Sequence, residues 1–426
     1  MVRSILLSVS AALLLAAAST TAMAATTHWE FVDANQPQTK EFQPACGKQL
    51  RGVYEDLSIY AVPEECIVKS SMLPAEHMYS QLIVLERQHR EGDTPQDILD
   101  WNNSVQEAVA DFATDDLVEE STSKQLPYSI FRGRRNKNLK HRKSLQAVVD
   151  QVDVKTLEQD VTWLSGEANG SPFITRSSTS KQSIEVAEWL KSQFESYGCD
   201  TVELMSYQTR FGPNVICTFK GTEYPDEHVI LGAHHDSRGS FLNPRAPGAD
   251  DDGSGTTMLL QVARIIKANN LTFGRTFIIS AFSGEEQGLF GSAALAKKLK
   301  SQGTTITMMV QGDMLAYRKP GEPIQVAFPA RYHTAELSSL LHNVTELYVP
   351  EAVVGITGAC CSDHQSFWEA GYPATAFFER NGPIADPKYH NSGDLVYREG
   401  YDFAQLRAST QAMLASVFEV AEAKLK

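Results

Sequence analysis

From Ser144 to the C-terminus, short apolar segments alternate with amphipathic segments, and this alternation limits the fold more than any other feature. Strands are expected at residues 201–207, 214–220, 228–231, 275–281, 305–310, 324–328 and 372–378. Helices are expected at residues 183–196, 256–268, 289–301, 334–347 and 403–424. The pattern is typical of an α/β sheet with helices covering both faces. We therefore expect one α/β domain over residues 144–426.

The first 24 residues have the features of a secretory signal peptide. Arg3 precedes an apolar run from Ile5 to Ala18, and Ala22-Met23-Ala24 has the small-x-small pattern that signal peptidase cleaves. The apolar run is too short to span a bilayer, and no later segment reaches about 18 uninterrupted apolar residues. We expect an exported protein that begins near Ala25 and has no stable membrane anchor.

Residues 25–143 differ from the rest of the chain in charge. Residues 25–131 contain 19 acidic and 7 basic residues, with helix-like stretches at 76–91 and 95–113, whereas residues 132–143 contain 7 basic and no acidic residues. The basic run RGRRNKNLKHRK offers many sites to trypsin-like proteases. We interpret residues 25–143 as a small pro-segment that ends in a linker cut by a processing protease. A nucleic-acid or membrane patch and a solvated surface run are the alternatives.

The overall net charge of -14 argues against nucleic acid as a partner, because the region after the basic run is acidic as well. The cysteines form three local pairs, namely Cys46 with Cys66, Cys199 with Cys217, and Cys360 beside Cys361. Export permits disulfides, and the first two pairs are suitable bridges. Adjacent cysteines close only a strained ring, so Cys360 and Cys361 either stay free or pair elsewhere. A zinc-thiolate site is disfavoured because no C-x-x-C spacing occurs.

Histidine and carboxylate side chains follow several of the predicted strands. They are His234 in GAHHDS, Asp250–Asp252 in GADDDGSG, Glu285 and Glu286 in SGEEQGL, Asp313 in QGDM and His390 in PKYHNSGD. Residues at the carboxyl ends of strands converge in α/β sheets. Imidazole and carboxylate ligands suit zinc, and three consecutive aspartates repel one another unless a cation is near. The set predicts a two-metal hydrolase in which one aspartate bridges the ions.

Simpler interpretations compete at each position. His235 rivals His234 as the ligand, and Asp252 could only cap the following helix. The two glutamates could merely favour a helix N-terminus, or one could bind metal while the other acts as general base. Asp236, two residues after His234, could fix the tautomer of a ligating imidazole. Serine catalysis is disfavoured, because Ser178–Lys181 matches S-x-x-K but its companion motifs are absent.

The segments GAHHDS, APGADDDGSG, SGEEQGL, QGDM, CSDH and PKYH resemble, in the same order, those of the M28 zinc peptidases. The resemblance covers residues 144–426 and is greatest to secreted bacterial leucine aminopeptidases with two co-catalytic zinc ions. It implies a mixed, mostly parallel sheet sandwiched between helices. It also implies a bridging aspartate, two ligands for each ion, a general base and a support for the first histidine. Asp251 would bridge the two ions, His234 and Asp313 would bind one ion, and Glu286 and His390 would bind the other. Glu285 would be the general base, and Asp236 would support His234.

The same resemblance implies substrates with a free N-terminus and a large apolar first residue such as leucine. Candidates for the pocket of that side chain are Met314, Ala376, Phe378, Ile384 and Tyr389. The chain departs from the pattern at Ala359, where relatives have a tyrosine that stabilises the oxyanion, and at Thr357, where they have a disulfide cysteine. The alternatives are a related carboxypeptidase or dipeptidase, a one-zinc enzyme similar to glutaminyl cyclase, and a noncatalytic binding ectodomain.

Overall fold

The computed structural model describes residues 26–33, 49–54, 57–63, 79–87, 139–240, 243–359 and 361–425. The chain forms two compact units, residues 1–123 and 124–426. The signal-peptide segment, Cys46, Cys66, Cys360 and residues 95–113 lie outside the described residues.

The first unit contains one small sheet. Its strands are β1 (Thr26–Asp33), β2 (Gln49–Tyr54), β3 (Leu57–Pro63) and β4 (Tyr79–Arg87), in the spatial order β1-β4-β3-β2. The helix expected over residues 76–91 is wrong, because residues 79–87 form β4, which pairs with β1 on one side and β3 on the other. The run from Leu82 to Leu85 is continuously apolar, and such a run suits a strand with two neighbours as well as a helix.

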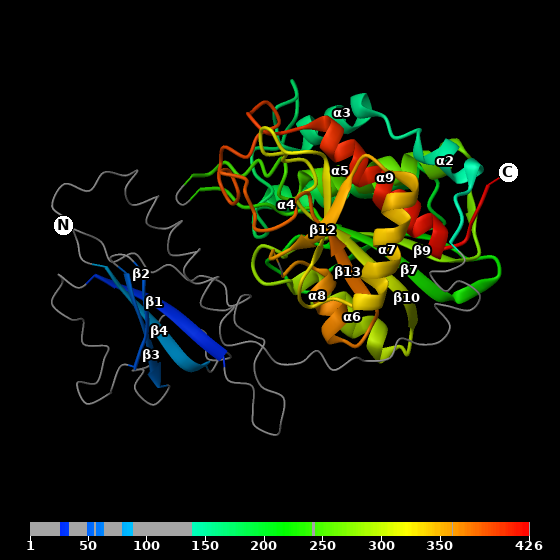
Figure 1. Cartoon of the computed structure of the whole chain (residues 1–426). Coiled ribbons are helices and arrows are strands. Elements are labelled where there is room, and N and C mark those ends of the chain that lie inside the picture. The colour runs from blue at the N-terminus through cyan, green and yellow to red at the C-terminus, as the bar shows by residue number, and fades with distance from the viewer. Residues whose placement is uncertain are drawn as a thin grey trace. The chain divides into compact units, whose positions relative to one another are not determined.

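The second unit is built on a six-stranded sheet of order β13-β10-β7-β9-β6-β5. The strands are β5 (Thr201–Met205), β6 (Asn214–Phe219), β7 (Tyr224–His234), β9 (Arg275–Phe282), β10 (Thr305–Gly312) and β13 (Ala374–Phe377). The strands β13, β10, β7 and β9 run parallel, whereas β6 and β5 are antiparallel to their neighbours. The predicted α/β class with a mostly parallel sheet is confirmed (Figure 1).

Helices cover both faces of this sheet. They are α2 (Lys143–Val149), α3 (Val154–Leu164), α4 (Lys181–Ser196), α5 (Gly253–Ala268), α6 (Phe290–Ser301), α7 (Ala335–Tyr348), α8 (His364–Glu369) and α9 (Phe403–Val420). Figure 1 shows α3, α5 and α9 on one side and α6 and α8 on the other. Because successive strand side chains point to opposite faces, Val229 and Leu231 of β7 pack in one hydrophobic cluster and Ile230 in the other. None of the described helices is long and apolar enough to cross a membrane.

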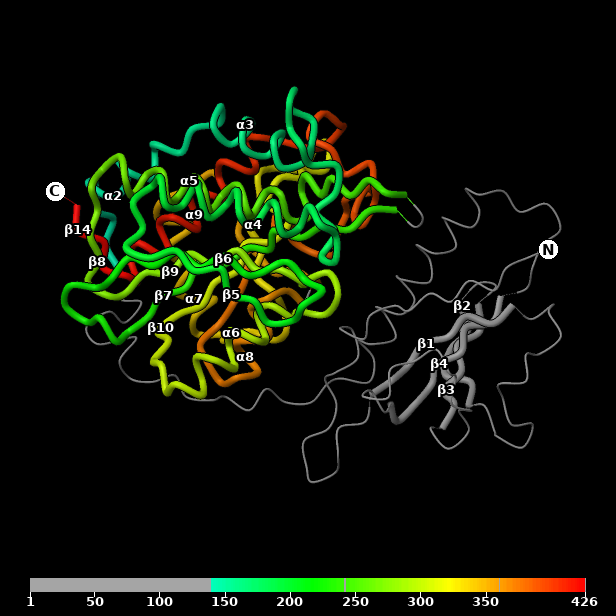
Figure 2. Tube along the Cα trace, turned by 180° about the vertical axis from the view of Figure 1, so that it is seen from behind, coloured from blue at the N-terminus to red at the C-terminus, as the bar shows by residue number. Residues whose placement is uncertain are grey.

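Two short sheets complete the unit. Strands β11 (Gln325–Pro329) and β12 (Val353–Thr357) pair in parallel, and β8 (Thr272–Phe273) pairs with β14 (Ala423–Lys424) near the C-terminus (Figure 2). The last helix was expected to reach residue 424, but α9 ends at Val420. The chain turns at Glu422, whose φ is 58°, and its next two residues then join β8.

The predicted bridge between Cys199 and Cys217 is present, with the two Cα atoms 5.7 Å apart. Cys217 pairs with Val202 across the β5–β6 hairpin, because β5 ends at Met205 and the connection is longer than the sequence pattern indicates. Cys361 is also disulfide-bonded, so the alternative in which it stays free is wrong.

Candidate metal centre and active site

Three neighbouring parallel strands end at the same edge of the sheet, and each is followed by a candidate site residue. His234 is the last residue of β7, Glu285 and Glu286 follow β9, and Asp313 directly follows β10. The two other members come from loops: Asp251 precedes α5, and His390 lies between β13 and α9. Because carboxyl ends of parallel strands share one edge, these residues meet although they are far apart in sequence.

Around His234, imidazole and carboxylate atoms lie within a few ångströms of one another. The Nε2 atom of His234 is 3.3 Å from Oδ1 of Asp251, 3.6 Å from Oδ1 of Asp313 and 3.9 Å from Oε2 of Glu285. His234 is completely buried. We call His234, Asp313 and Asp251 the His234 half of the site.

A second group surrounds His390. Its Nε2 atom is 3.3 Å from Oδ2 of Asp251 and 3.2 Å from Oε2 of Glu286. We call Asp251, Glu286 and His390 the His390 half. Asp251 thus faces His234 with one carboxylate oxygen and His390 with the other, so it belongs to both halves.

The neighbouring aspartate, Asp252, also lies close to His234 and Asp313. Its oxygens already accept hydrogen bonds from the main-chain N–H of Gly255, at 2.8 Å, and of His234, at 3.0 Å. The first of these bonds makes Asp252 the N-cap of α5, which is the simpler role considered for it. Asp251 therefore has the freer carboxylate.

The donor atoms fit a bound cation. Nε2 of His234, Oδ2 of Asp251 and Oε1 of Glu286 are buried and have no hydrogen-bond partner within the described part of the chain. Such atoms are costly in a folded protein unless something binds them. Burial and the nearby Glu286 carboxylate raise the pKa of Asp251 well above its usual value. A cation would relieve this crowding of negative charge, and carboxylate with imidazole is a donor set that zinc accepts.

Asp236 organises the ligand shell behind His234. Nδ1 of His234 is 3.1 Å from the main-chain oxygen of Asp236 and 3.6 Å from its carboxylate. The same carboxylate accepts hydrogen bonds from the main-chain N–H groups of Glu285 and Glu286, both at 3.3 Å. Asp236 therefore ties the end of β7 to the turn that carries the two glutamates.

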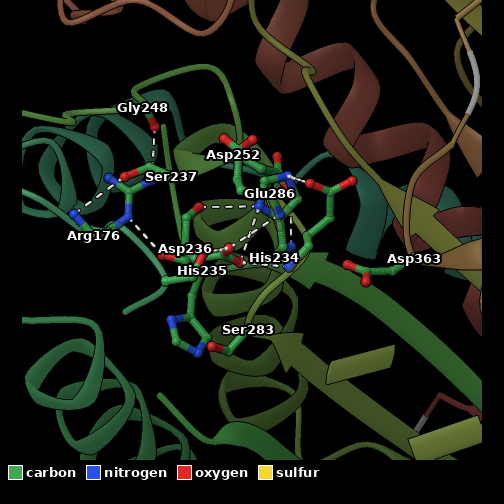
Figure 3. A network of polar contacts seen from close by, with 12 residues as sticks. Arg176, His234, His235, Asp236, Ser237, Gly248, Asp252, Ser283, Glu286 and Asp363 are labelled. Carbon is green, nitrogen blue, oxygen red and sulfur yellow. Dashed lines mark hydrogen bonds and ion pairs between the residues drawn. The ribbon is translucent and has the colours of Figure 1, made fainter. Parts of the chain in front are cut away.

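The two adjacent histidines, His234 at the end of β7 and His235 directly after it, point in different directions. The ring of His235 points away from His234 and Glu286 (Figure 3), and its Nε2 atom lies 3.0 Å from the main-chain oxygen of Pro213. His235 consequently lies outside both halves of the site.

Two arginines of this site were not found from the sequence. Arg176 is fully buried and donates to the main-chain oxygens of Leu164, His235, Pro247 and Gly248. It thereby holds the loop that leads to the aspartates. Figure 3 shows Arg176 with His235 and Gly248. Arg238 contacts Glu286, with its Nε 3.2 Å from Oε2. Only the position of Arg238, two residues after Asp236, could have drawn attention to it.

The charges of the two glutamates differ. Burial opposes ionisation of Glu286, but His390 and Arg238 lower the pKa of its carboxyl to about 2. Burial raises the pKa of Glu285 well above its ordinary value, and the Asp313 and Glu286 carboxylates raise it further. Glu286 thus suits a permanently ionised role, whereas Glu285 is the better proton acceptor.

Ser178, the serine of the S-x-x-K match, has a structural contact. It is buried and donates to Oδ2 of Asp236 at 2.5 Å. Lys181 pairs with Glu185 at the surface instead. The arrangement offers no serine–lysine pair.

The pocket candidates lie in three places. Met314, Phe378 and Ile384 line one small hollow, together with Ala359 and Arg380 among others. Ala376 is buried and packs in a cluster with Phe378. Tyr389 stacks on His390, with ring centroids 3.7 Å apart.

The chain is similar to known proteins in both sequence and fold. Residues 214–416 match the sequence model of peptidase family M28. Leucine aminopeptidase 1 of Sclerotinia sclerotiorum is 31% identical over 296 residues, which are 65% of this chain and 76% of that protein.

Solved structures show the same fold. The LapA aminopeptidase of Legionella pneumophila matches with a TM-score of 0.59 and 24% identity, over 70% of this chain and 80% of that one. A glutaminyl cyclase of Tannerella forsythia matches with a TM-score of 0.52 and 19% identity, over 63% of this chain and 98% of that one. The fold therefore does not separate these two activities, and the sequence relatives and site residues must do so.

Proposed function

The chain belongs to peptidase family M28 and is a metallo-aminopeptidase, and we propose that it uses two zinc ions to release leucine and other large apolar residues from the N-termini of peptides. Family membership itself implies zinc. The observation that carries the two-ion count is Asp251, whose two oxygens face two separate groups of donor atoms.

In this proposal His234 and Asp313 hold one ion, Glu286 and His390 hold the other, and Asp251 is shared. Bound zinc ions would supply an activated water and polarise the carbonyl group of the scissile peptide bond. Asp236 keeps the proton of His234 on Nδ1, which leaves Nε2 free as the ligand atom.

Glu285 is the proposed general base. Its carboxylate lies beside the ligand set, 3.9 Å from Nε2 of His234, but carries the raised pKa of a proton acceptor. It takes the proton of the attacking water and gives it to the amine that leaves.

The hollow formed by Met314, Phe378 and Ile384 is the proposed binding place for the first side chain. It adjoins the site, because Met314 follows Asp313 directly. Burying a large aliphatic side chain contributes roughly 1.5 to 3 kcal/mol, whereas an unpaired carboxylate there is penalised. We therefore propose a preference for leucine over glutamate or glycine.

Metal analysis together with a panel of aminoacyl chromogenic substrates tests this function. We expect two zinc ions per chain and a kcat/KM for leucine that exceeds that for glutamate by about 10- to 150-fold, from the same burial energy. N-acetyl-leucine substrates should be inert. Equal rates for leucine and glutamate would exclude the pocket, and cyclisation of N-terminal glutamine without release of leucine would favour the glutaminyl cyclase alternative.

We also propose that the protein is secreted and that the segment before the catalytic unit is removed. The support is the N-terminal apolar run and the basic run RGRRNKNLKHRK. Arg142 pairs with buried Glu419 at 3.1 Å, and Leu139 packs on the main core. We therefore propose that the removed segment ends before Leu139, within the basic run, rather than at residue 143 as the sequence pattern suggests. Intact-mass analysis of active secreted protein decides this, and a fully active species that begins near Ala25 would contradict removal.

A further inference from the structure

We propose that Arg238 is a positioning residue that shapes the His390 half of the metal site by locking the conformation of Glu286. This inference rests on the proposed two-ion function. Arg238 lies in the loop after β7, and only its position two residues after Asp236 connects it with the metal site in sequence.

The guanidinium contacts Glu286 at two points. Its Nε is 3.2 Å from the side-chain Oε2, and its Nη2 donates to the main-chain oxygen of the same residue. One rigid, planar group therefore holds both ends of the glutamate, which restrains the torsions between them. A lysine has the charge but lacks this fork.

Arg238 contacts one of the two carboxylate oxygens of Glu286. Arg238 and Nε2 of His390 both face Oε2 of Glu286, whereas Oε1 is buried and lacks a hydrogen-bond partner among the described residues. Nη1 of Arg238 also lies 3.5 Å from Nδ1 of His390. The same guanidinium thus borders two members of the His390 half and leaves one carboxylate oxygen of Glu286 available.

Charge supports the same role. The Glu286 side chain is only 1% exposed, and one of its carboxylate oxygens lies within 4.8 Å of a carboxylate oxygen of Asp251. Like charges so close repel each other, which favours a displaced carboxylate unless a positive group lies beside it. The Arg238 side chain, 32% exposed, is the arginine that contacts this group and offsets the repulsion.

A purely electrostatic account predicts the reverse effect. A fixed positive charge repels a cation, so removing Arg238 would then strengthen metal binding in the His390 half. Under that account, Arg238→Lys would resemble the wild type, whereas positioning predicts that lysine falls between arginine and glutamine.

The test measures zinc affinity of the full chain by competition with a chelator. Wild type, Arg238→Lys and Arg238→Gln are compared with Arg264→Gln, which removes a similarly exposed arginine that pairs with Asp160 outside the site. Loss of such a supporting contact typically weakens metal affinity by about 10- to 100-fold. We expect that loss in one binding step for Arg238→Gln, a smaller loss for Arg238→Lys, and no change in the control.

Binding by Arg238→Gln that is as tight as wild type, or tighter, would overturn the inference, and so would wild-type behaviour of Arg238→Lys. If the metal-free Arg238→Gln chain does not fold in thermal unfolding, Arg238→Lys alone decides, because it keeps the charge and loses the fork. A wild-type protein that binds a single zinc ion would instead defeat the two-ion function and this inference with it.

Discussion

The two halves of the metal site share Asp251, but the groups beside their histidines carry opposite charges. His234 ends the strand β7 inside the sheet, is fully buried, and has the carboxylate of Asp236 behind its Nδ1 atom at 3.6 Å. His390 lies in a loop, its side chain is 18% exposed, and the guanidinium of Arg238 stands near its Nδ1 atom. A carboxylate behind a ligating imidazole raises its basicity, and a guanidinium does not.

Two sites with similar ligands can therefore differ in their affinity for zinc. A strand end surrounded by the core holds its donor in one orientation, whereas a loop donor depends on contacts such as those of Tyr389 and Arg238. We therefore expect the His234 half to bind zinc more tightly and the His390 half to release it first. Four predictions test this comparison.

The largest effect is expected from Glu285→Gln, which changes neither half. Glutamine has nearly the same shape but cannot accept the proton of water, so kcat should fall by about 10²- to 10⁴-fold. The zinc content should remain that of the wild type. Measuring kcat and zinc on the same sample checks this, and a variant that sheds zinc would show that Glu285 is a ligand.

Next come ligand substitutions, one in each half. Glu286→Gln and Asp313→Asn each remove one charged ligand. Each should lower the affinity for one zinc ion by more than roughly 100-fold, the largest loss typical of residues that only support a ligand. The other ion should stay bound, because Asp251 and the opposite pair are intact. Zinc stoichiometry during stepwise chelation reports this, and simultaneous loss of both ions in both variants would mean that the halves are not separable.

A smaller effect is expected for Asp236→Asn, the counterpart of Arg238 in the other half. Asparagine loses the charge behind His234, so affinity for the tightly held ion should fall by about 10- to 100-fold. Asp160→Asn, at a carboxylate paired with Arg264 outside the site, serves as the control. The comparison fails if the weakly held ion is the one that responds.

The smallest effect is expected at Tyr389, whose ring stacks on His390. Removing a stacked aromatic ring costs about 0.5 to 1.5 kcal/mol, so Tyr389→Ala should weaken the His390 half by about 2- to 13-fold. Tyr389→Phe keeps the ring and should bind zinc like the wild type. A loss in Tyr389→Phe equal to that in Tyr389→Ala would show that the hydroxyl, rather than the stacking, is responsible.

Much of the fold could be predicted because long periodic segments determine their own type. The helix α4 and the strand β9 lie within a few residues of their expected positions. The strand β4 could not be assigned, since its apolar run suits a helix as well, and pairing with β1 and β3 decides its state. The early end of α9 also depends on a distant partner, β8.

Some residues of the candidate site could likewise be predicted from the sequence, and one could not. His234, Glu286 and Asp313 could be selected because each follows an apolar strand, and carboxyl ends of such strands converge whatever the details of packing. Arg238 could not be selected, because an arginine in a loop is usually solvated, and only its contact with Glu286 distinguishes it.

The sequence by itself determined the chemical type of the site, since the kinds of donor side chains and their places after strands do not depend on long-range contacts. Only the tertiary structure decided which of two adjacent histidines and which of three consecutive aspartates face the centre. Neighbouring side chains on a strand point to opposite faces, and a loop takes its direction from what it touches. For His235 that contact is Pro213, which lies on another segment of the chain. Asp252 caps α5 through Gly255, a local role that its position before the helix already allowed.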